Sequence, residues 1–225
     1  MGHLHGRLIV FDLDGTVIDS RRDLTDSANQ LIAELGGAPL SEEAVGLMVG
    51  EGAALLVKRA LDAAGLRDDP TALARFLEIY DIRALHHTVP YEGIVPAIQT
   101  ARHFARVALL TNKLAGPTER LLDELGLRAL FDDVVGGDGA HPRKPDPASL
   151  LMLMAMARAE PAGTLLVGDS RIDHQTALRG GARCCLARYG FGAVTIRKEE
   201  LSGDEWTVDA PNELPDVFQL FTADE

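Results

Sequence analysis

The chain contains 225 residues, of which 46% are hydrophobic and 25% are charged, a composition typical of a soluble globular protein with a substantial core. Its 22 basic and 34 acidic residues give a net charge of −12, which repels nucleic acid and anionic membranes. The apolar run from Leu150 to Ala157 falls far short of the roughly 20 residues of a membrane span. We therefore expect a cytoplasmic protein, a monomer or a homodimer, that binds a small molecule rather than nucleic acid or a membrane.

Short apolar runs alternate with helical patterns through most of the chain. Runs without polar alternation predict strands that are covered on both faces of a parallel sheet. The predicted strands cover Leu8–Asp12, Val107–Thr111, Asp133–Gly137 and Thr164–Asp169, with a further short strand at Trp206–Val208. The predicted helices cover Pro117–Gly126, Pro147–Ala157 and Asp173–Gly180, with a last helix from Asn212. This alternation indicates the α/β class, with an open parallel sheet of the Rossmann-like kind.

One long segment, from about Ser20 to Val89, contains helical patterns and no convincing strand. An apolar stripe from Leu24 to Leu35 predicts its first helix, which the pair Gly36–Gly37 ends. Two more helices are expected at 53–64 and 71–87. We therefore expect residues 1–19 and 90–225 to form the α/β core, with residues 20–89 inserted as a small helical domain.

Polar side chains follow the predicted strands at their carboxyl ends, where open parallel sheets bind ligands. Asp12 and Asp14 are two residues apart in an extended segment, so their side chains project to the same side. One carboxylate can attack phosphorus, while the other exchanges a proton with the leaving oxygen and then with water. Gly15 permits a sharp turn that lets a phosphate approach closely.

Further strand ends supply groups that suit a phosphate ester. Thr111, Asn112 and Lys113 offer a hydroxyl, an amide and an amine, which can hold phosphate oxygens or simply form a capping turn. Lys144 lies in a loop between Arg143 and Pro145. An ammonium fixed there can neutralise both an attacking carboxylate and the transferring phosphoryl group.

A cluster of acids predicts a metal ion. Asp169 is the natural partner of Asp12 in holding a hard cation, and Mg²⁺ prefers oxygen ligands. Asp173 either joins this cluster or stabilises the first turn of the following helix through its dipole. Converging carboxylates repel one another without a cation, so we expect Mg²⁺ as the cofactor.

The helical segment offers one candidate contact to the substrate. Gly50 and Gly52 directly precede the helix that begins at Ala53, so free N–H groups and the positive end of the helix dipole can face a second anion. Lys58 or Arg59 would assist from the same helix. The alternative is a plain glycine hinge between two helices. The adjacent Cys184 and Cys185, by contrast, are expected to be two buried or half-buried thiols without a mutual disulfide.

These motifs, in this order, resemble those of the haloacid-dehalogenase superfamily, including a helical cap domain inserted after the first strand. The resemblance implies that Asp12 is the nucleophile and Asp14 is the general acid and base. It implies Mg²⁺ ligation by Asp12, by the backbone carbonyl of Asp14, by Asp169 directly and by Asp173 directly or through water. It also implies that Thr111 binds phosphate and that Lys144 is the conserved basic residue.

Within this superfamily, an acid at position 14 is typical of phosphate-ester enzymes and not of dehalogenases. The chain most resembles phosphoglycolate phosphatases, on the stretches VGEGAALLVKRAL, PYEG, VVGGDGAHPRKPDP, VGDSRIDHQTALRGGA and RYGFG. The resemblance implies a magnesium-dependent phosphatase that acts on a small phosphorylated metabolite through an aspartyl-phosphate, with 2-phosphoglycolate as the expected substrate.

Other functions fit parts of the same pattern. A sugar-phosphate mutase, a pyrophosphatase or a nucleotidase would use the same core and differ in the inserted domain. A receiver-type signalling module also groups Asp, Thr and Lys side chains, but such a domain is roughly half this length and lacks both the insertion and the D-L-D-G-T motif.

Overall fold

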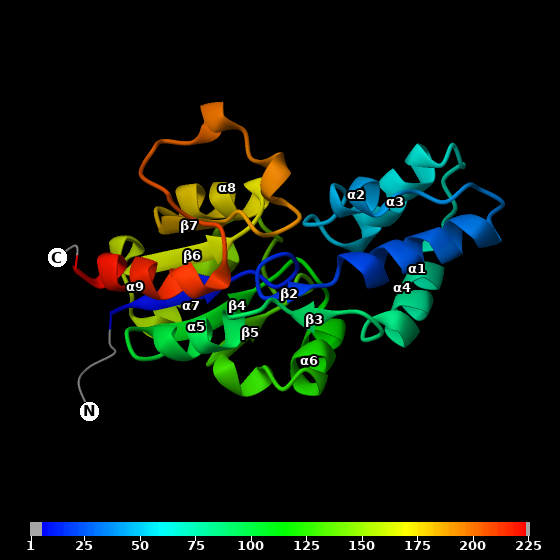
Figure 1. The fold of residues 1–225 in the computed structure, drawn as a ribbon. Coiled ribbons are helices and arrows are strands. Elements are labelled where there is room, and N and C mark those ends of the chain that lie inside the picture. The colour runs from blue at the N-terminus through cyan, green and yellow to red at the C-terminus, as the bar shows by residue number, and fades with distance from the viewer. Residues whose placement is uncertain (1–5, 224–225) are drawn as a thin grey trace.

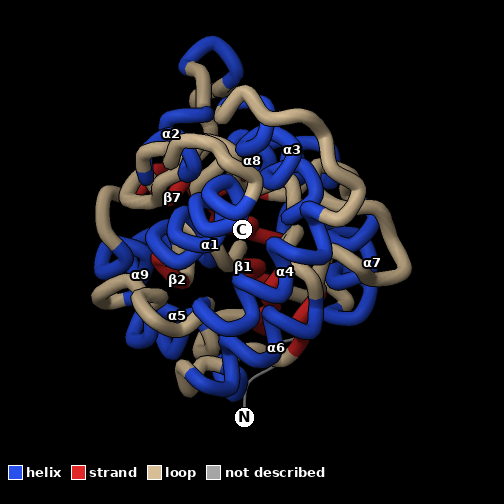
Figure 2. The backbone as a smooth tube through the Cα atoms, turned by 90° about the vertical axis from the view of Figure 1, so that its right-hand side faces the viewer, coloured by secondary structure: helices blue, strands red, loops and turns tan. Residues whose placement is uncertain are grey.

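The computed structural model describes residues 6–223, so the outermost parts of the predicted core, residues 1–5 and 224–225, lie outside it. An α/β region and a group of four helices lie side by side along the molecule (Figure 1). Viewed from the helical end, helices enclose the central strands (Figure 2).

The α/β region is built on a six-stranded sheet of parallel strands in the order β5-β4-β1-β6-β7-β8. Its strands are β1 (Leu8–Phe11), β4 (Arg106–Leu110), β5 (Asp133–Val135), β6 (Thr164–Gly168), β7 (Arg183–Ala187) and β8 (Trp206–Val208). The first strand lies inside the sheet, between β4 and β6. The predicted α/β class with a parallel sheet is confirmed.

Both faces of this sheet are buried, which explains why its strands are continuously apolar. Ile9 and Phe11 of β1 pack in one apolar cluster, and Leu8 and Val10 pack in another. The first cluster includes residues of α5 (Ile94–Ala101), α6 (Ala115–Glu124) and α9 (Leu214–Ala223). The second includes residues of α7 (Ala148–Ala157) and α8 (Arg171–Gly180).

The two cysteines follow the same alternation along β7. Cys185 belongs to the first cluster and Cys184 to the second. Both are buried and free, as expected.

Several predicted boundaries were wrong. Three predicted strands end one residue early, at Phe11, Leu110 and Gly168, and β5 ends at Val135. The polar residues that follow therefore lie in loops, where their side chains are free to turn toward a ligand. The strand β7 was not predicted, and α6 begins two residues before Pro117.

The helical region comprises α1 (Arg21–Glu34), α2 (Glu42–Gly46), α3 (Ala53–Ala63) and α4 (Ala72–Arg83), here called the cap helices. A small antiparallel pair, β2 (Ile18–Asp19) and β3 (Val89–Pro90), joins both ends of this segment to the α/β region. The short helix α2 was not anticipated.

The third predicted cap helix was too long, because it ends at Arg83 and not at His87. The buried carboxylate of Asp23 explains the early end. It accepts hydrogen bonds from the backbone N–H groups of His87 and Thr88, at 2.9 and 2.8 Å, and from the Thr88 hydroxyl. These N–H groups are thereby satisfied outside the helix.

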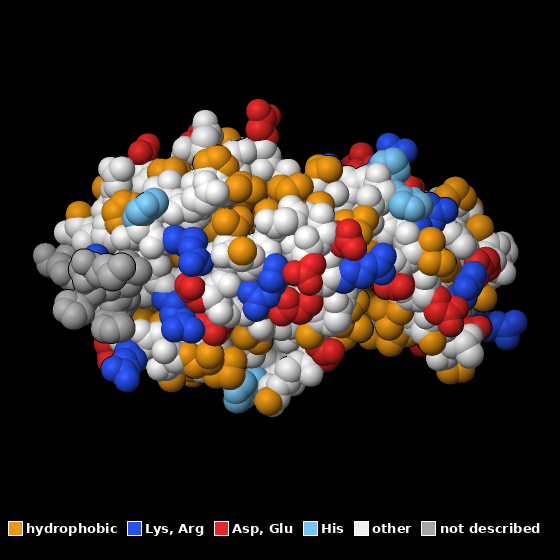
Figure 3. Space-filling view, turned by 90° about the horizontal axis from the view of Figure 1, so that it is seen from below, with side chains coloured by type: hydrophobic (Ala, Val, Ile, Leu, Met, Phe, Trp, Pro, Cys, Tyr) orange, Lys and Arg blue, Asp and Glu red, His pale blue; other side chains and the backbone are white. Residues whose placement is uncertain are grey.

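The described surface carries charges of both signs, and Figure 3 shows acidic and basic side chains interspersed along one face. Among residues 6–223, no helix has the length and apolar character needed to cross a membrane.

Candidate active site

The carboxyl edge of the sheet brings together the side chains that the sequence marked as candidates. Asp12 follows β1, Thr111 follows β4 and Asp169 follows β6, and these three strands are neighbours in the sheet. Lys144 reaches the same point from the loop between β5 and α7. The parallel arrangement thus brings together side chains that are far apart in the sequence, up to 157 residues from Asp12 to Asp169.

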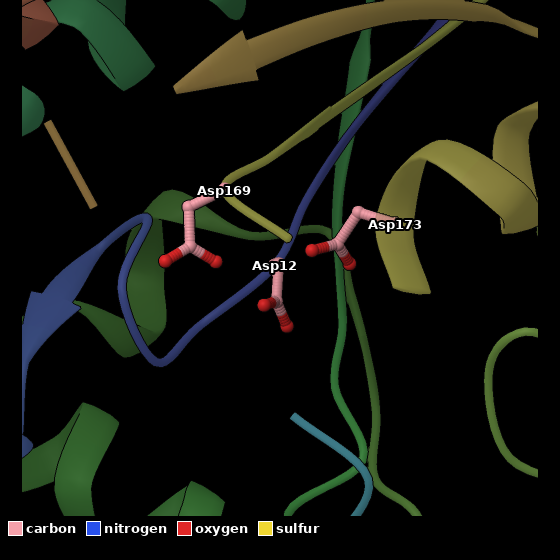
Figure 4. A group of neighbouring side chains, drawn as sticks. All are labelled: Asp12, Asp169 and Asp173. Atoms are coloured by element: carbon pink, nitrogen blue, oxygen red, sulfur yellow. The ribbon is translucent and has the colours of Figure 1, made fainter. Parts of the chain in front are cut away.

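Three buried aspartates form the centre of the site. Asp12, Asp169 and Asp173 each place one carboxylate oxygen within 4.8 Å of the others. Figure 4 shows their carboxylates gathered around a common space, with Asp173 projecting from the start of α8. The predicted acidic cluster is therefore present.

Lys144 bridges two of these acids. Its Nζ lies 2.7 Å from Asp12 Oδ1 and 2.6 Å from Asp173 Oδ1, and its side chain is only 2% exposed. Burial acts to lower the pKa of Lys144, but the two carboxylates outweigh it and raise the pKa above its usual value. The ammonium is therefore charged at neutral pH and fixed against the nucleophile candidate.

One lysine does not neutralise three buried carboxylates. Burial, followed by the nearby charge of Asp173, raises the pKa of Asp12 to about 7 despite the contact with Lys144. Burial and the charges of Asp173 and Asp12 also raise the pKa of Asp169 well above its usual value. The cluster therefore has excess negative charge when its acids are ionised.

A hard cation fits this arrangement. Asp12 Oδ2 and Asp169 Oδ1 accept no hydrogen bond within residues 6–223, because Lys144 contacts Oδ1 of Asp12 and the N–H of Gly192 donates to Oδ2 of Asp169. Carboxylate oxygens are the ligands that Mg²⁺ prefers. The donor set, the crowding and the unpaired oxygens all suit a divalent cation.

Asp169 is held in place by glycine-rich backbone from two loops. Its Oδ2 accepts a hydrogen bond of 2.7 Å from the N–H of Gly192. Gly15, with φ of +90°, leaves room for it, since a Cβ there would lie 2.0 Å from Asp169 Oδ2. A Cβ at Gly190 would lie 2.3 Å from Asp169 Cβ. These positions admit no larger residue without displacing Asp169.

Asp173 serves both of the roles that the sequence left open. Its Oδ2 accepts hydrogen bonds from the backbone N–H and the hydroxyl of Ser170, at 3.1 and 2.6 Å, which stabilises the start of α8. Its Oδ1 contacts Lys144. Asp173 is therefore a helix-capping residue and a member of the acidic cluster.

Asp14 lies apart from the cluster and has its own partners. Lys113 Nζ lies 3.1 and 3.0 Å from its two oxygens, and the hydroxyl of the buried Ser20 donates a hydrogen bond to Oδ1. The carboxylate is thus oriented from two sides. Of the four residues predicted to hold a metal, Asp14 is the one whose carboxylate is not in the cluster.

Asn112 connects the α/β region to the cap helices. Its amide nitrogen donates hydrogen bonds to the backbone carbonyls of Gly50 and Lys144, at 2.8 and 2.9 Å. Both amide donors are used, so a contact from this side chain to a phosphate oxygen requires one of the bonds to break. Thr111 lies beside it, and its Oγ1 accepts a hydrogen bond from the N–H of Lys113 while its own proton is available to a ligand.

A pocket lies between the sheet edge and the cap helices. Its polar wall contains Asp12, Asp14 and residues 111–113 of the α/β region. The opposite wall is formed by Gly50, Gly52, Ala53 and apolar side chains of the cap helices, with the aromatic residues Phe76 and Tyr80.

The two cations suggested on α3 do not line this pocket. Lys58 pairs with Asp62 and Asp68, and Arg59 pairs with Glu51. The sequence reasoning missed Ser20, Tyr80 and the RYGFG glycines as parts of the site. The glycine spacing in RYGFG is a local signal that could have indicated a backbone packed closely against another group.

Comparison with known proteins identifies the family. The sequence-family model of the haloacid dehalogenase-like hydrolases matches residues 9–187 of this chain. The chain is a haloacid dehalogenase-like hydrolase. The sequence resemblance to this superfamily is confirmed.

Curated relatives of this hydrolase carry a common name. It is 42% identical over 193 residues to phosphoglycolate phosphatase 1 of Pseudomonas aeruginosa, and this alignment covers 82% of the chain and 70% of the relative. It is 40% identical over 217 residues to the phosphoglycolate phosphatase of Rhodospirillum rubrum, and that alignment covers 89% of the chain and 90% of the relative. The hydrolase is therefore a phosphatase, a phosphoric monoester hydrolase of the phosphoglycolate phosphatase-like kind.

Solved structures support the fold. The crystal structure of a predicted phosphoglycolate phosphatase from Haemophilus somnus superposes with a TM-score of 0.86 at 24% identity, and covers 94% of this chain and 97% of that one. At this identity the likeness concerns the fold alone.

Proposed function

We propose that this hydrolase converts 2-phosphoglycolate to glycolate and phosphate, with Asp12 as nucleophile and Mg²⁺ as cofactor. The observation that carries the proposal is the contact of Lys144 with Asp12 inside the buried acidic cluster, at the end of the central strand. The names of the relatives supply the substrate.

The first step uses two carboxylates. An oxygen of Asp12 attacks phosphorus and forms a new P–O bond, while the bond from phosphorus to the glycolate oxygen breaks. Asp14 gives its proton to that departing oxygen. The product is an aspartyl-phosphate on Asp12, and glycolate leaves.

The second step returns the enzyme to its starting state. Asp14 takes a proton from water, the water oxygen attacks phosphorus, and the bond to Asp12 breaks. Inorganic phosphate is released. The partners Lys113 and Ser20 keep Asp14 oriented for both proton transfers.

Positive charge is the other requirement, since phosphoryl transfer depends mainly on positioning and electrostatic stabilisation. Lys144 supplies a fixed charge beside Asp12. Asp12, Asp169, Asp173 and the Asp14 carbonyl would hold Mg²⁺, which would supply additional positive charge for phosphoryl transfer. Thr111 is the proposed hydroxyl donor to phosphate, and Gly50 and Gly52 remain predicted contacts to the substrate.

The test combines a substrate panel with one substitution. We expect kcat/KM for 2-phosphoglycolate to exceed the values for glucose phosphates, nucleotides and pyrophosphate, with inorganic phosphate as product. Preference for another ester by more than tenfold, about 1.4 kcal/mol, contradicts the substrate. Transfer of the phosphoryl group to a sugar in place of water contradicts hydrolysis as the main reaction.

Asp12→Asn tests the nucleophile, because an amide oxygen does not form the acyl-phosphate. We expect it to fold and to lose more than about a hundredfold in turnover, roughly 3 kcal/mol of barrier. The exposed Asp123 on α6 provides the matched control, and Asp123→Asn should retain full activity. Substantial turnover by the Asp12 variant would rule out this role.

A further inference from the structure

Lys113 is the one Lys or Arg side chain among the described residues that line the pocket. Lys144 contacts Asp12 and Asp173 behind the pocket, and does not line it. The Lys113 side chain is only 9% exposed. Its ammonium lies between Asp14 of the α/β region and the ring of Tyr80 on α4, 4.7 Å from the ring centroid.

A substrate with two anionic groups needs a cation at this position. Its phosphate would lie at Asp12, and a carboxylate two atoms beyond the ester oxygen would extend along the pocket past Asp14. Whenever Asp14 is ionised it would repel that carboxylate, and the chain as a whole carries a net charge of −12. Lys113 is placed to offset this negative charge.

Two polar groups at this position have capacity for a ligand. The hydrogen bonds to Asp14 use two of the three donors of the Lys113 ammonium, and the third is available to the neighbouring Tyr80 hydroxyl or to an acceptor in the pocket. The Tyr80 hydroxyl is buried, and its own proton has no acceptor within residues 6–223. Burial raises the pKa of Tyr80, so this hydroxyl remains protonated and can donate.

We propose that Lys113 and Tyr80 form the subsite for the carboxylate of the leaving group, and that Lys113 determines the preference for acidic over uncharged leaving groups. This inference rests on the proposed phosphatase reaction and deepens it. Lys113 binds the carboxylate directly and Tyr80 donates a second hydrogen bond to it. The cap helices thus contribute to specificity through a residue of α4, in contact with a lysine of the α/β region.

The experiment uses two pairs of esters that differ only by the carboxylate. Ethyl phosphate has a methyl group where 2-phosphoglycolate has its carboxylate, and isopropyl phosphate relates to 2-phospholactate in the same way. The within-pair ratio of kcat/KM measures recognition of the carboxylate alone. It is determined for the wild type, Lys113→Met, Tyr80→Phe and the control Lys58→Met, all saturated with Mg²⁺.

We expect Lys113→Met to lower the within-pair ratio at least about thirtyfold, which is roughly 2 kcal/mol of discrimination and typical of a hydrogen bond to a charged group. Tyr80→Phe removes only a hydroxyl and should lower the ratio about fivefold. Lys58 lies on α3 outside the pocket, so Lys58→Met should leave the ratio within twofold.

An unchanged within-pair ratio in Lys113→Met overturns the inference, whether both esters keep their rates or lose them equally. Equal losses would show that Lys113 acts only by orienting Asp14. If Lys113→Met does not fold, an unchanged ratio in Tyr80→Phe has the same consequence. Failure of the proposed substrate is distinct, because it appears in the wild type as a preference for 2-phospholactate over 2-phosphoglycolate by more than tenfold.

Discussion

The polar wall of the pocket and the acidic cluster behind it, here together called the core wall, are rich in charged side chains that contact one another. The opposite cap wall consists of apolar side chains and glycine backbone. On the core wall, Asp12, Asp173 and Lys144 are buried and joined by contacts of 2.6 and 2.7 Å. On the cap wall, Phe76 and Tyr80 belong to the apolar cluster and contribute packing in place of charge.

The two walls also differ in the contacts that hold them in place. Each acid of the core wall has partners from the sheet edge or the adjoining loops. The polar contacts between the cap segment and the α/β region include the hydrogen bond from Asn112 to Gly50, the exposed ion pair between Arg120 and Asp81, and the contact of Lys113 with the Tyr80 ring. In the proposed mechanism, the core wall carries the phosphoryl chemistry and the cap wall selects the leaving group.

The largest expected effect concerns the core wall. Asp169→Ala should raise the Mg²⁺ concentration for half-maximal activity about a hundredfold, because it removes a carboxylate from the cluster. Asp173→Ala should raise it less, by about tenfold, and should also destabilise the fold by about 3 kcal/mol. The second effect arises because Asp173 also pairs with Lys144 and stabilises the start of α8.

Titration of activity with Mg²⁺ and thermal unfolding in chelator separate the two variants. Asp123→Ala, at an exposed position of α6, is the control for loss of a carboxylate as such. Ordinary Mg²⁺ dependence in the Asp169 variant would remove this residue from the proposed ligands. Equal stability of the two variants would contradict the additional role of Asp173.

The next largest expected effect is an increase of several degrees in Tm for Asp12→Asn in chelator, and it follows from the charge of the core wall. Burial and Asp173 raise the pKa of Asp12 from 3.8 to about 7, so in chelator the folded state binds this proton more tightly than the unfolded state. Stability from this group is therefore complete at low pH and is lost as the pH rises through about 7. Asp12→Asn resembles the protonated form and should exceed the wild type in Tm at pH 8.

The comparison is made by thermal unfolding between pH 4 and pH 8. The Tm difference between Asp12→Asn and wild type should approach zero near pH 4, where both side chains are uncharged. Added Mg²⁺ should narrow it at pH 8, since the cation offsets the wild-type charge. A difference that does not vary with pH would show that Asp12 is not destabilised by its surroundings.

The core wall was largely predictable from the sequence because several of its groups directly follow apolar strands. Parallel strands align their carboxyl ends, so Asp12, Thr111 and Asp169 had to converge once the strands were recognised. Their chemical types then limited the reaction. Exact strand ends were not predictable, because apolar character continues to the last paired residue and does not mark it.

The cap wall and the supporting contacts were not predictable in this way. Tyr80 lies on an amphipathic helix like many others, and only the docking of α4 brings it to Lys113. The contact between Gly192 and Asp169 depends on how a loop folds back across 23 residues. Such contacts depend on tertiary packing, which hydrophobic periodicity does not encode.

The smallest expected effect concerns the attachment of the cap helices. Arg120 on α6 pairs with Asp81 on α4, and their side chains are 43% and 66% exposed, so Arg120→Met should cost less than about 1 kcal/mol of stability. Arg128→Met is the matched control, because Arg128 pairs with Glu119 within the α/β region at 38% and 44% exposure. Both variants should unfold at nearly the wild-type temperature.

If the Arg120 pair holds the cap wall against the pocket, Arg120→Met alone should raise KM for 2-phosphoglycolate two- to threefold while kcat stays unchanged. Identical KM values in both variants would show that this ion pair has no part in positioning the cap, and would leave the Asn112–Gly50 hydrogen bond as the polar attachment nearest the pocket.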